Sequence, residues 1–404
     1  MLAYISSFLT FQPCNYTILE IKSVGMRALK SIWVDLAEKS YPIFLDDNWN
    51  TLFEKARACL ENRQGSLKGR KMLIITDENV HELYHKAVKE AFETWGMVTA
   101  TAVVPPGEAS KSLQQAEELY TKALEAGLDR HSLIAALGGG VIGDLAGFTA
   151  STYMRGIPFI QIPTSLLAQV DSSIGGKVAV NHPMAKNIIG SFYQPECVLI
   201  NVSTLRTLPG REYSSGMAEL IKHGIIRDEA FLAWLESSQE SLVLRNAEVL
   251  IQAIHRSCEI KADVVAKDEK ETGIRAVLNF GHTVGHAIEA ATGYGTYTHG
   301  EAVSIGMIAE AYIAQLSGFI SPDYISRISK ILSRAGLPTL MPDLNSQELL
   351  NWMQHDKKNV GSRIVFVLPV APGKVKVFRD IDTKLVLKAL DAARNEILNK
   401  YADI

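Results

Sequence analysis

The sequence predicts an α/β protein of two domains, a Rossmann-like domain over residues 26–207 and an all-helical domain over residues 208–404. Three observations support this prediction. Short strand-like runs alternate with helical patterns in the first half, a glycine-rich loop follows one of these runs, and long amphipathic helical patterns fill the second half. With 404 residues, 47% of them hydrophobic, the chain has enough apolar material for two cores.

Six apolar runs in the first half have the character of strands: IWVDL, KMLIIT, TATAVV, LIAAL, FIQIP and CVLINV. Runs of this kind separated by helical stretches are typical of parallel strands whose crossover helices cover both faces of the sheet. After the turn at Thr207 to Glu212 the pattern becomes helical, with one later strand-like stretch near Arg363 to Val370. We expect a ligand in the cleft between the two halves.

Composition argues against several classes of protein. Lysine and arginine number 41 against 44 acidic residues, a net charge of -3, so we expect no binding to nucleic acid. No apolar run approaches the ~20 residues that a membrane helix needs, so no membrane span is expected. The cysteines Cys14, Cys59, Cys197 and Cys258 form no CxxC pair, which favours free thiols in a reducing compartment, the cytoplasm.

The first 25 residues are expected to be a leader that is disordered or not translated, with synthesis starting at Met26. The opening MLAYISSFLTF is mildly apolar. It lacks a basic n-region and a small-residue cleavage site, so it makes a poor signal peptide.

The glycine-rich loop, residues 138–144, reads GGGVIGD and follows the strand-like run LIAAL. It satisfies G-x-G-x-x-G before a helical stretch, where backbone N–H groups can approach a pyrophosphate. The alternative is a tight turn that binds no ligand. The acidic residue that usually binds ribose lies ~20 positions downstream, but here the candidate, Asp77, ends the upstream run KMLIIT. This order suggests a nucleotide site unlike that of the common dehydrogenases.

Histidines gather in the second half. Asn279, His282 and His286 are spaced by three and four residues, which predicts one helical face, and His299 follows shortly after. A lone histidine on a helix is usually structural, but two on one face with a third nearby favour a metal site. The motif HExxH is excluded because Thr283 follows His282. The spacing alone allows both His282 and His286 to bind metal.

A carboxylate must complete such a site. Glu219 and Lys222 in MAELIKH share one face of an otherwise apolar helical segment, where an unpaired carboxylate would be costly. A simple salt bridge between them is the alternative.

Basic and polar residues also gather in the segments 171–177 and 186–187 and at Lys261 and Arg275. Solvated surface charge is the default interpretation of any one of them. Their concentration around a metal site instead indicates a substrate with several anionic groups, which need paired, directional donors.

The chain resembles the 3-dehydroquinate synthase family from about Val34 to Leu368. The segments that carry the resemblance are, in order, GGGVIGDLAGF, YMRGIPFIQIPTSLLAQVDSSIGGK, VNHPMAKNIIGSFYQP, GMAELIKHGII, CEIKADVV, LNFGHTVGHAIE and HGEAVSIGM. The resemblance implies a Rossmann-like domain followed by a helical domain, a fold shared more distantly with glycerol dehydrogenase and iron-containing alcohol dehydrogenases. Val178-Ala179 stands where Thr-Gly is common in the family, and Ser165 replaces a usual threonine.

The resemblance also implies roles for individual residues. The metal, zinc with cobalt as an alternative, would be held by Glu219, His282 and His299, while His286 would face the substrate phosphate. NAD would be bound by Asp77, Glu108, Lys111, Gly139, Gly140, Asp144, Thr164, Ser165, Lys186 and Thr207. The substrate would be surrounded by Asp171, Lys177, Asn187, Lys222, Lys261, Arg275, Asn279, His286 and a lysine of the pair Lys357 and Lys358, with Lys357 preferred. Arg155 would reach the site of a neighbouring subunit, which implies a homodimer.

The implied activity is conversion of 3-deoxy-D-arabino-heptulosonate 7-phosphate to 3-dehydroquinate and phosphate. Arg275, Lys261, Asn279 and His286 favour a substrate with a carboxylate and argue against valiolone or deoxy-scyllo-inosose synthesis. Aminodehydroquinate synthesis stays open as an alternative. A metal-dependent polyol dehydrogenase is a further alternative, but it would not need cations that face a phosphate. A non-catalytic binding protein is less well supported, because it would not need the metal ligands.

Overall fold

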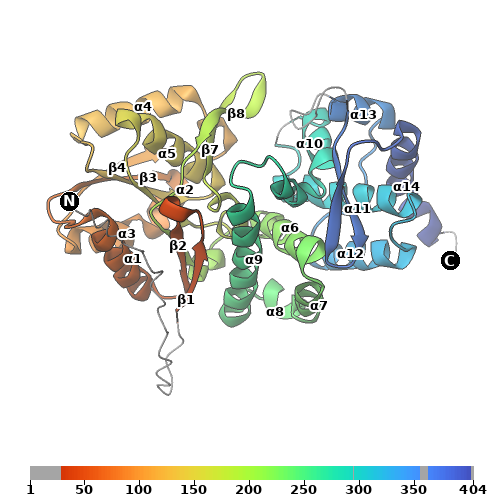
Figure 1. Ribbon diagram of the computed structural model, residues 1–404, viewed down its shortest axis with the longest axis horizontal. Helices are drawn as coiled ribbons and strands as arrows, with labels where there is room; N and C mark the ends of the chain where they lie inside the picture. Colours follow the sequence, from red (N-terminus) through yellow and green to blue (C-terminus); the bar gives the residue numbers. More distant parts are fainter. Residues whose placement is uncertain (1–28, 294, 355–362, 402–404) are drawn as a thin grey trace, which may run out of the picture.

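The computed structural model describes residues 29–293, 295–354 and 363–401. The predicted leader, residues 1–25, and Lys357 and Lys358 lie outside this part of the chain. A seven-stranded sheet forms the first half (Figure 1), in the order β1 (Lys30–Val34), β2 (Tyr41–Asp46), β9 (Val198–Asn201), β6 (Phe159–Pro163), β5 (Leu133–Gly138), β3 (Lys71–Asp77) and β4 (Val98–Val104). Only β1 pairs antiparallel to its neighbour.

Helices cover both faces of the sheet because side chains along a strand alternate between the faces. Met72 and Ile74 of β3 are buried with α1 (Trp49–Gln64) and α3 (Lys86–Thr94). The intervening Leu73 and Ile75 are buried with residues of α4 (Leu113–Glu125) and α5 (Gly140–Thr152). The predicted Rossmann-like fold is therefore confirmed, and its strands are apolar on both sides as a doubly covered sheet requires.

The second half is mainly helical (Figure 1). Its helices are α6 (Gly210–Arg227), α7 (Glu229–Ser237), α8 (Gln239–Val243), α9 (Ala247–Lys267), α10 (His282–Ala291), α11 (His299–Leu316), α12 (Pro322–Arg334), α13 (Ser346–Gln354) and α14 (Thr383–Tyr401). A small antiparallel hairpin of β10 (Phe366–Ala371) and β11 (Lys374–Phe378) interrupts them. Its first strand lies where the late strand-like stretch was expected.

The two halves share part of one hydrophobic core. Tyr41 and Ile43 of β2 belong to the same buried cluster as Leu220 of α6 and Ile254 of α9. In Figure 1, α6 and α9 lie in the middle of the molecule, between the sheet and the remaining helices. The packing is thus continuous across the predicted boundary at residues 207 and 208, and that boundary stays a prediction.

Three features differ from the expected pattern. Neither the strand β2 nor the hairpin of β7 (Lys177–His182) and β8 (Ala185–Phe192) was foreseen. Asn279 does not share a helix with the histidines, because the turn η7 (Ile274–Asn279) ends there and α10 begins only after Gly281, whose φ is 81°. A left-handed backbone at Gly281 breaks the helical spacing that the sequence suggested.

The remaining short elements are α2 (Glu78–Val80), η1 (Ala37–Lys39), η2 (His81–His85), η3 (Glu108–Ser110), η4 (Tyr153–Arg155), η5 (Ala168–Ser172) and η6 (Val202–Arg206). Within the described ranges, no helix has both the length and the apolar character that crossing a membrane requires. Cys59, Cys197 and Cys258 are free thiols, and Cys14 lies outside the described residues.

Candidate active site

The carboxyl edge of the sheet carries the residues expected to bind a nucleotide. β3 and β5 are neighbours, and β3 continues to β4 on one side whereas β5 continues to β6 on the other, so the chain leaves these two strands in opposite directions. A crevice forms at such a switch point, outside the carboxyl ends of the strands, where open α/β sheets bind ligands. Asp77 ends β3, and Gly139 and Gly140 connect β5 to α5, so these three residues meet at this edge.

A Cβ atom would be too close to a neighbouring side chain at Gly140, but would make only an ordinary contact at Gly139. A Cβ atom on Gly140 would lie 2.9 Å from Ser172 Oγ, and one on Gly139 would lie 3.4 Å from Ser165 Oγ. Thr164 is tied to the same loop because its N–H donates to the carbonyl of Gly138 at 3.0 Å. The start of α5 thus offers backbone N–H groups of a helix N-terminus, which favour an anion.

Asp77 and Thr207 are fixed on the other side of the crevice. The Asp77 carboxylate caps α2 by accepting from the N–H of Val80 at 3.1 Å. Burial raises the pKa of Asp77, although this hydrogen bond opposes the shift. Tyr84 Oη lies 2.5 Å from Thr207 Oγ1.

A polar network joins the hairpin β7–β8 to this edge. The Lys111 ammonium contacts Asn187 and lies 2.5 Å from the carboxylate of Asp144. Burial raises the pKa of Asp144, and Lys111 acts against that rise. Asn181 joins the network by donating to Glu108 at 2.7 Å and accepting from the N–H of Asn187 at 2.8 Å. The resemblance assigned Lys111 to the nucleotide and Asn187 to the substrate, and here they are direct neighbours.

Three potential metal ligands converge from three helices. Glu219 of α6, His282 at the start of α10 and His299 at the start of α11 offer ligand atoms that all lie within 4.8 Å of one another. The Nε2 atoms of His282 and His299 lie 3.6 Å and 3.8 Å from Glu219 Oε1. This is the ligand set that the resemblance implied.

Close helix packing brings the two histidines together. A Cβ atom on Gly306 of α11 would lie 2.0 Å from the carbonyl oxygen of Gly281, so only glycine allows α11 to approach the start of α10 this closely. Glu310, fully buried on α11, accepts from the N–H groups of Gly281, Thr283 and Val284 at 2.8, 3.1 and 3.3 Å. A carboxylate at a helix N-terminus satisfies its free N–H groups and interacts favourably with its dipole.

The second nitrogen of each imidazole faces an acceptor. His282 Nδ1 lies 3.2 Å from the carbonyl oxygen of Phe280, and His299 Nδ1 lies 3.7 Å from Glu289 Oε2. Burial lowers the pKa of His299, but the carboxylates of Glu289 and Glu219 outweigh it and the net shift is upward. For Glu289, burial raises the pKa, yet His299 and Lys186 bring it down to about 2. Glu289 is therefore an ionised carboxylate.

The surroundings of Glu219 fit a bound cation. Its side chain is fully buried and contacts the equally buried ammonium of Lys222. Despite that ion pair, neither carboxylate oxygen has a hydrogen bond of acceptable geometry among the described residues. A buried carboxylate without such bonds is costly, and two imidazole nitrogens beside it complete a set of donors that suits zinc or cobalt.

Two other groups of potential ligands overlap this one, and each already has cationic partners. Asp171, Glu219 and His223 form the first, but Asp171 is paired with the Lys261 ammonium. Burial and the charge of Lys222 lower the pKa of His223 to about 3, so this imidazole is neutral. The second comprises His286, Glu289 and His299. There the Glu289 carboxylate lies 3.6 Å from the ammonium of Lys186, and its oxygens are not among the buried atoms without a hydrogen bond, as those of Glu219 are.

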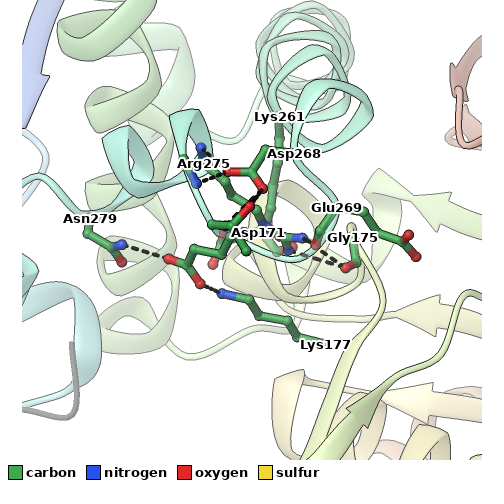
Figure 2. A network of polar contacts seen from close by, with 11 residues as sticks. Asp171, Gly175, Lys177, Lys261, Asp268, Glu269, Arg275 and Asn279 are labelled. Atoms are coloured by element: carbon green, nitrogen blue, oxygen red, sulfur yellow. Dashed lines mark hydrogen bonds and ion pairs between the residues drawn. The ribbon is translucent and has the colours of Figure 1, made fainter. Parts of the chain in front are cut away.

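Cationic side chains surround the Glu219 cluster. Lys261 of α9 contacts the Asp171 carboxylate and donates to the Asp171 carbonyl at 2.5 Å (Figure 2). Burial raises the pKa of Asp171, but Lys261 and Lys222 outweigh burial and hold it well below its usual range. Burial lowers the pKa of Lys261 despite this pairing. Asp171, Lys222 and Lys261 thus form a compact, largely buried group of charges next to Glu219.

Arg275 and Lys177 complete the ring of cations. The Arg275 guanidinium is almost fully buried and donates to the carbonyl of Gly175 at 3.2 Å and to that of Glu269 at 2.5 Å (Figure 2). Lys177 pairs with the carboxylate of Glu271, which also accepts from Asn279 Nδ2 at 2.7 Å. Asn279 therefore reaches the site from η7, although it is not on the histidine helix.

Two expected residues, His286 and Arg155, lie outside the contacts described so far, and three further residues of the site were not expected. His286 lies beside the metal ligands, with its ring centroid 5.5 Å from that of His282 and 6.1 Å from that of His299. Arg155 is exposed and belongs to no contact described above. Glu271, Glu289 and His223 were missed, because a single acidic residue or histidine in a loop or on a helix has no distinctive sequence spacing.

The fold and this site define an enzyme class in which a Rossmann-like sheet is joined to a helical metal-binding half. A valiolone synthase from Streptomyces hygroscopicus, solved with NAD+ and Zn2+, has a TM-score of 0.79 and 24% identity, covering 91% of this chain and 98% of that one. A 2-deoxy-scyllo-inosose synthase, solved with carbaglucose-6-phosphate, NAD+ and Co2+, has a TM-score of 0.80 and 25% identity, with 89% and 99% covered. A butanol dehydrogenase from Thermotoga maritima is more distant, at a TM-score of 0.59 and 14% identity, with 87% and 96% covered.

The chain belongs to the 3-dehydroquinate synthase family. The model of the N-terminal part of 3-dehydroquinate synthase matches residues 101–215, and that of the C-terminal part matches residues 216–359. The 3-dehydroquinate synthase of Desulforamulus reducens is 49% identical over 361 residues, which is 89% of this chain and 99% of that protein. The enzyme of the same name from Symbiobacterium thermophilum is 47% identical over 363 residues, 89% of this chain and all of that protein.

The geometry predicts that Glu219→Gln loses bound metal while the fold survives. The amide is nearly isosteric but carries no negative charge, so one of three ligands is lost. Glu212→Gln is the matched control, since Glu212 lies exposed in the first turn of the same helix. Elemental analysis and circular dichroism measure the outcome. Full metal occupancy in Glu219→Gln would make Glu219 only the ion-pair partner of Lys222.

Proposed function

We propose that this enzyme converts 3-deoxy-D-arabino-heptulosonate 7-phosphate to 3-dehydroquinate and phosphate, the step of the shikimate pathway carried out by its family. The observation that carries the proposal is the Glu219, His282 and His299 cluster beside the buried cations Lys222 and Lys261, next to the sheet edge expected to bind a nucleotide. A substrate with both a carboxylate and a phosphate explains why so many cations surround one candidate metal position.

The cofactors proposed are NAD and one divalent metal ion, preferably zinc. Two structural relatives were solved with NAD+ and with Zn2+ or Co2+, and the ligand set of this chain has the nitrogen and oxygen donors that both ions accept. When bound, NAD supplies a reversible hydride acceptor and the metal ion polarises oxygen atoms on the substrate. Asp77, Gly139 and Gly140 would hold the nucleotide, and the ligands named above would hold the metal.

The proposed chemistry solves a difficult elimination. The phosphate must leave while a hydrogen is lost from C6, a carbon that is not acidic in the starting sugar. Oxidation of the neighbouring C5 alcohol to a ketone makes the C6 proton removable, and loss of that proton expels the phosphate. Reduction at C5 then restores the alcohol, the sugar ring opens, and an intramolecular aldol addition closes the carbocycle.

The residues of this chain bind and orient the substrate during these steps. Arg275, Lys261 and Lys222 are buried cations, and their charge favours the anionic groups of the substrate in a site of low dielectric. Glu271 contacts both Lys177 and Asn279, so these two side chains are held in fixed directions. Holding the open chain in a closing conformation is what the final aldol step requires from the protein.

Other substrates are less well supported. The valiolone and inosose synthases share the fold at 24% and 25% identity, whereas the relatives that share 47% to 49% are 3-dehydroquinate synthases. Aminodehydroquinate synthesis is the remaining alternative among the cyclases. A polyol dehydrogenase of the same fold would have no use for Lys177, Lys261 and Arg275 around its metal. The same family membership supports a cytoplasmic lyase of aromatic amino acid biosynthesis.

The redox balance of the proposed reaction provides its test. The hydride taken from C5 returns to C5, so NAD is needed only in catalytic amount. With the purified holoenzyme and heptulosonate phosphate, we expect many equivalents of phosphate per NAD, without a matching rise in nicotinamide absorbance. Stoichiometric NADH without phosphate release would instead identify a dehydrogenase. Parallel assays with the amino analogue of the substrate separate the two cyclase activities.

We further propose a homodimer in which Arg155 acts on the neighbouring site. Its support is local backbone strain: Met154 and Arg155 have φ angles of 51° and 68°, a conformation that costs non-glycine residues about 1–3 kcal/mol each. Such strain persists when the surrounding structure enforces it, and Arg155 is exposed at this point.

Mixing two inactive variants tests this arrangement. Arg155→Ala and Lys177→Ala should each be inactive, and subunit exchange should restore part of the activity, because heterodimers contain one intact site. Activity and the extent of exchange are measured together. Absence of any recovery after verified exchange would contradict a shared site.

A further inference from the structure

Glu289 lies on α10, on the side of His299 that faces away from Glu219. His299 Nδ1 is 3.7 Å from Glu289 Oε2, while His299 Nε2 is 3.8 Å from Glu219 Oε1. Only 8% of Glu289 is exposed. The imidazole therefore lies between two buried carboxylates, one within the metal-ligand cluster and one outside it.

The two contacts have different chemical consequences for the ring. A neutral imidazole carries its proton on one nitrogen and a lone pair on the other, and only the lone pair can bind a metal ion. A carboxylate at Nδ1 keeps the proton on that nitrogen and leaves the lone pair on Nε2, directed to Glu219. His282 has the equivalent arrangement, because its Nδ1 faces the Phe280 carbonyl and its Nε2 faces Glu219.

The Glu289 carboxylate is itself held from a second direction. Its Oε1 lies 3.6 Å from the ammonium of Lys186, which belongs to the β7–β8 hairpin. One oxygen thus faces a lysine of the nucleotide-binding half and the other faces a histidine of the helical half. This bridge restricts the rotation of the carboxylate and, through it, the rotation of the His299 ring.

We propose that Glu289 is a positioning residue that fixes the tautomer and orientation of His299 for metal binding, and that Lys186 holds it in place. The proposal rests on the metal site of the proposed function. It assigns to Glu289 a role distinct from that of a ligand: metal binding through Glu289 would have to use Nδ1 of His299 and would leave the buried carboxylate of Glu219 without its cation.

Metal affinity in two substitutions of Glu289 provides the test. Glu289→Ala removes the acceptor, and loss of such a partner weakens metal binding by about 10–100-fold. Glu289→Gln keeps an acceptor oxygen without the charge and is expected to lose less. The zinc dissociation constant of each protein is measured by competition with a chromogenic chelator, and circular dichroism verifies folding.

Glu301→Gln is the matched control. Glu301 lies two residues after His299, on the same helix, but contacts Arg211 and caps the helix with Thr298. Glutamine also completes a capping box, so the start of α11 is preserved and zinc affinity should be unchanged. A loss in this control equal to that of Glu289→Ala would reduce the role of Glu289 to local stability and overturn the proposal.

The remaining outcomes distinguish failure of the positioning role of Glu289 from failure of the metal site on which that role rests. Unchanged zinc affinity in Glu289→Ala would overturn the positioning role. Complete loss of metal in both Glu289 variants, equal to that of Glu219→Gln, would make Glu289 a ligand and likewise overturn it. Retention of zinc by Glu219→Gln, in contrast, would refute the metal site of the proposed function itself.

Discussion

The structure depends on one costly feature, the negative charge of Glu219 inside a hydrophobic core. The residue lies on α6, where Ala218 and Leu220 on either side of it are fully buried, and it has the Lys222 ammonium as its only close cationic partner among the described residues. Buried charges in proteins are paired with an opposite charge or coordinate a metal ion. The approach of two imidazoles, the close packing of α10 on α11 and the caps of both helices can all be understood as arrangements that bring a cation to this carboxylate.

The same constraint explains why the two halves of the molecule are joined by packing rather than by a flexible linker. Asp171 lies in η5, which follows strand β6 of the sheet, and Lys261 lies on α9. Their ion pair forms next to α6. The contact of Lys186 with Glu289 makes a second link across the halves. Because these charged groups are partly or fully buried, small relative movements of the halves would leave them unsatisfied. The continuous core around β2, α6 and α9 holds them in register.

The sequence predicted those features that have a regular period or a local motif. The parallel strands were visible as apolar runs, the loop at Gly139 and Gly140 as a glycine pattern, and the candidate metal ligands His282 and His299 through resemblance to a family. Residues whose role depends on contacts between distant segments could not be found this way. Glu289 and Glu310 are single acids on helices, and only tertiary packing brings them to His299 and to the start of α10. The hairpin β7–β8 was missed because polar residues and a glycine interrupt its apolar residues, as in KVAVNH and AKNIIGSF, and Asn279 was misplaced because the left-handed turn at Gly281 interrupts the helical spacing.

The central claim is that Glu219, His282 and His299 bind one metal ion. Crystals of the cobalt-loaded protein, measured with X-rays at the cobalt absorption edge, test it most directly. The account predicts a single anomalous peak in contact with a Glu219 oxygen and with Nε2 of both histidines. A peak held instead by His286 and Glu289, or by Asp171 and His223, would contradict the account.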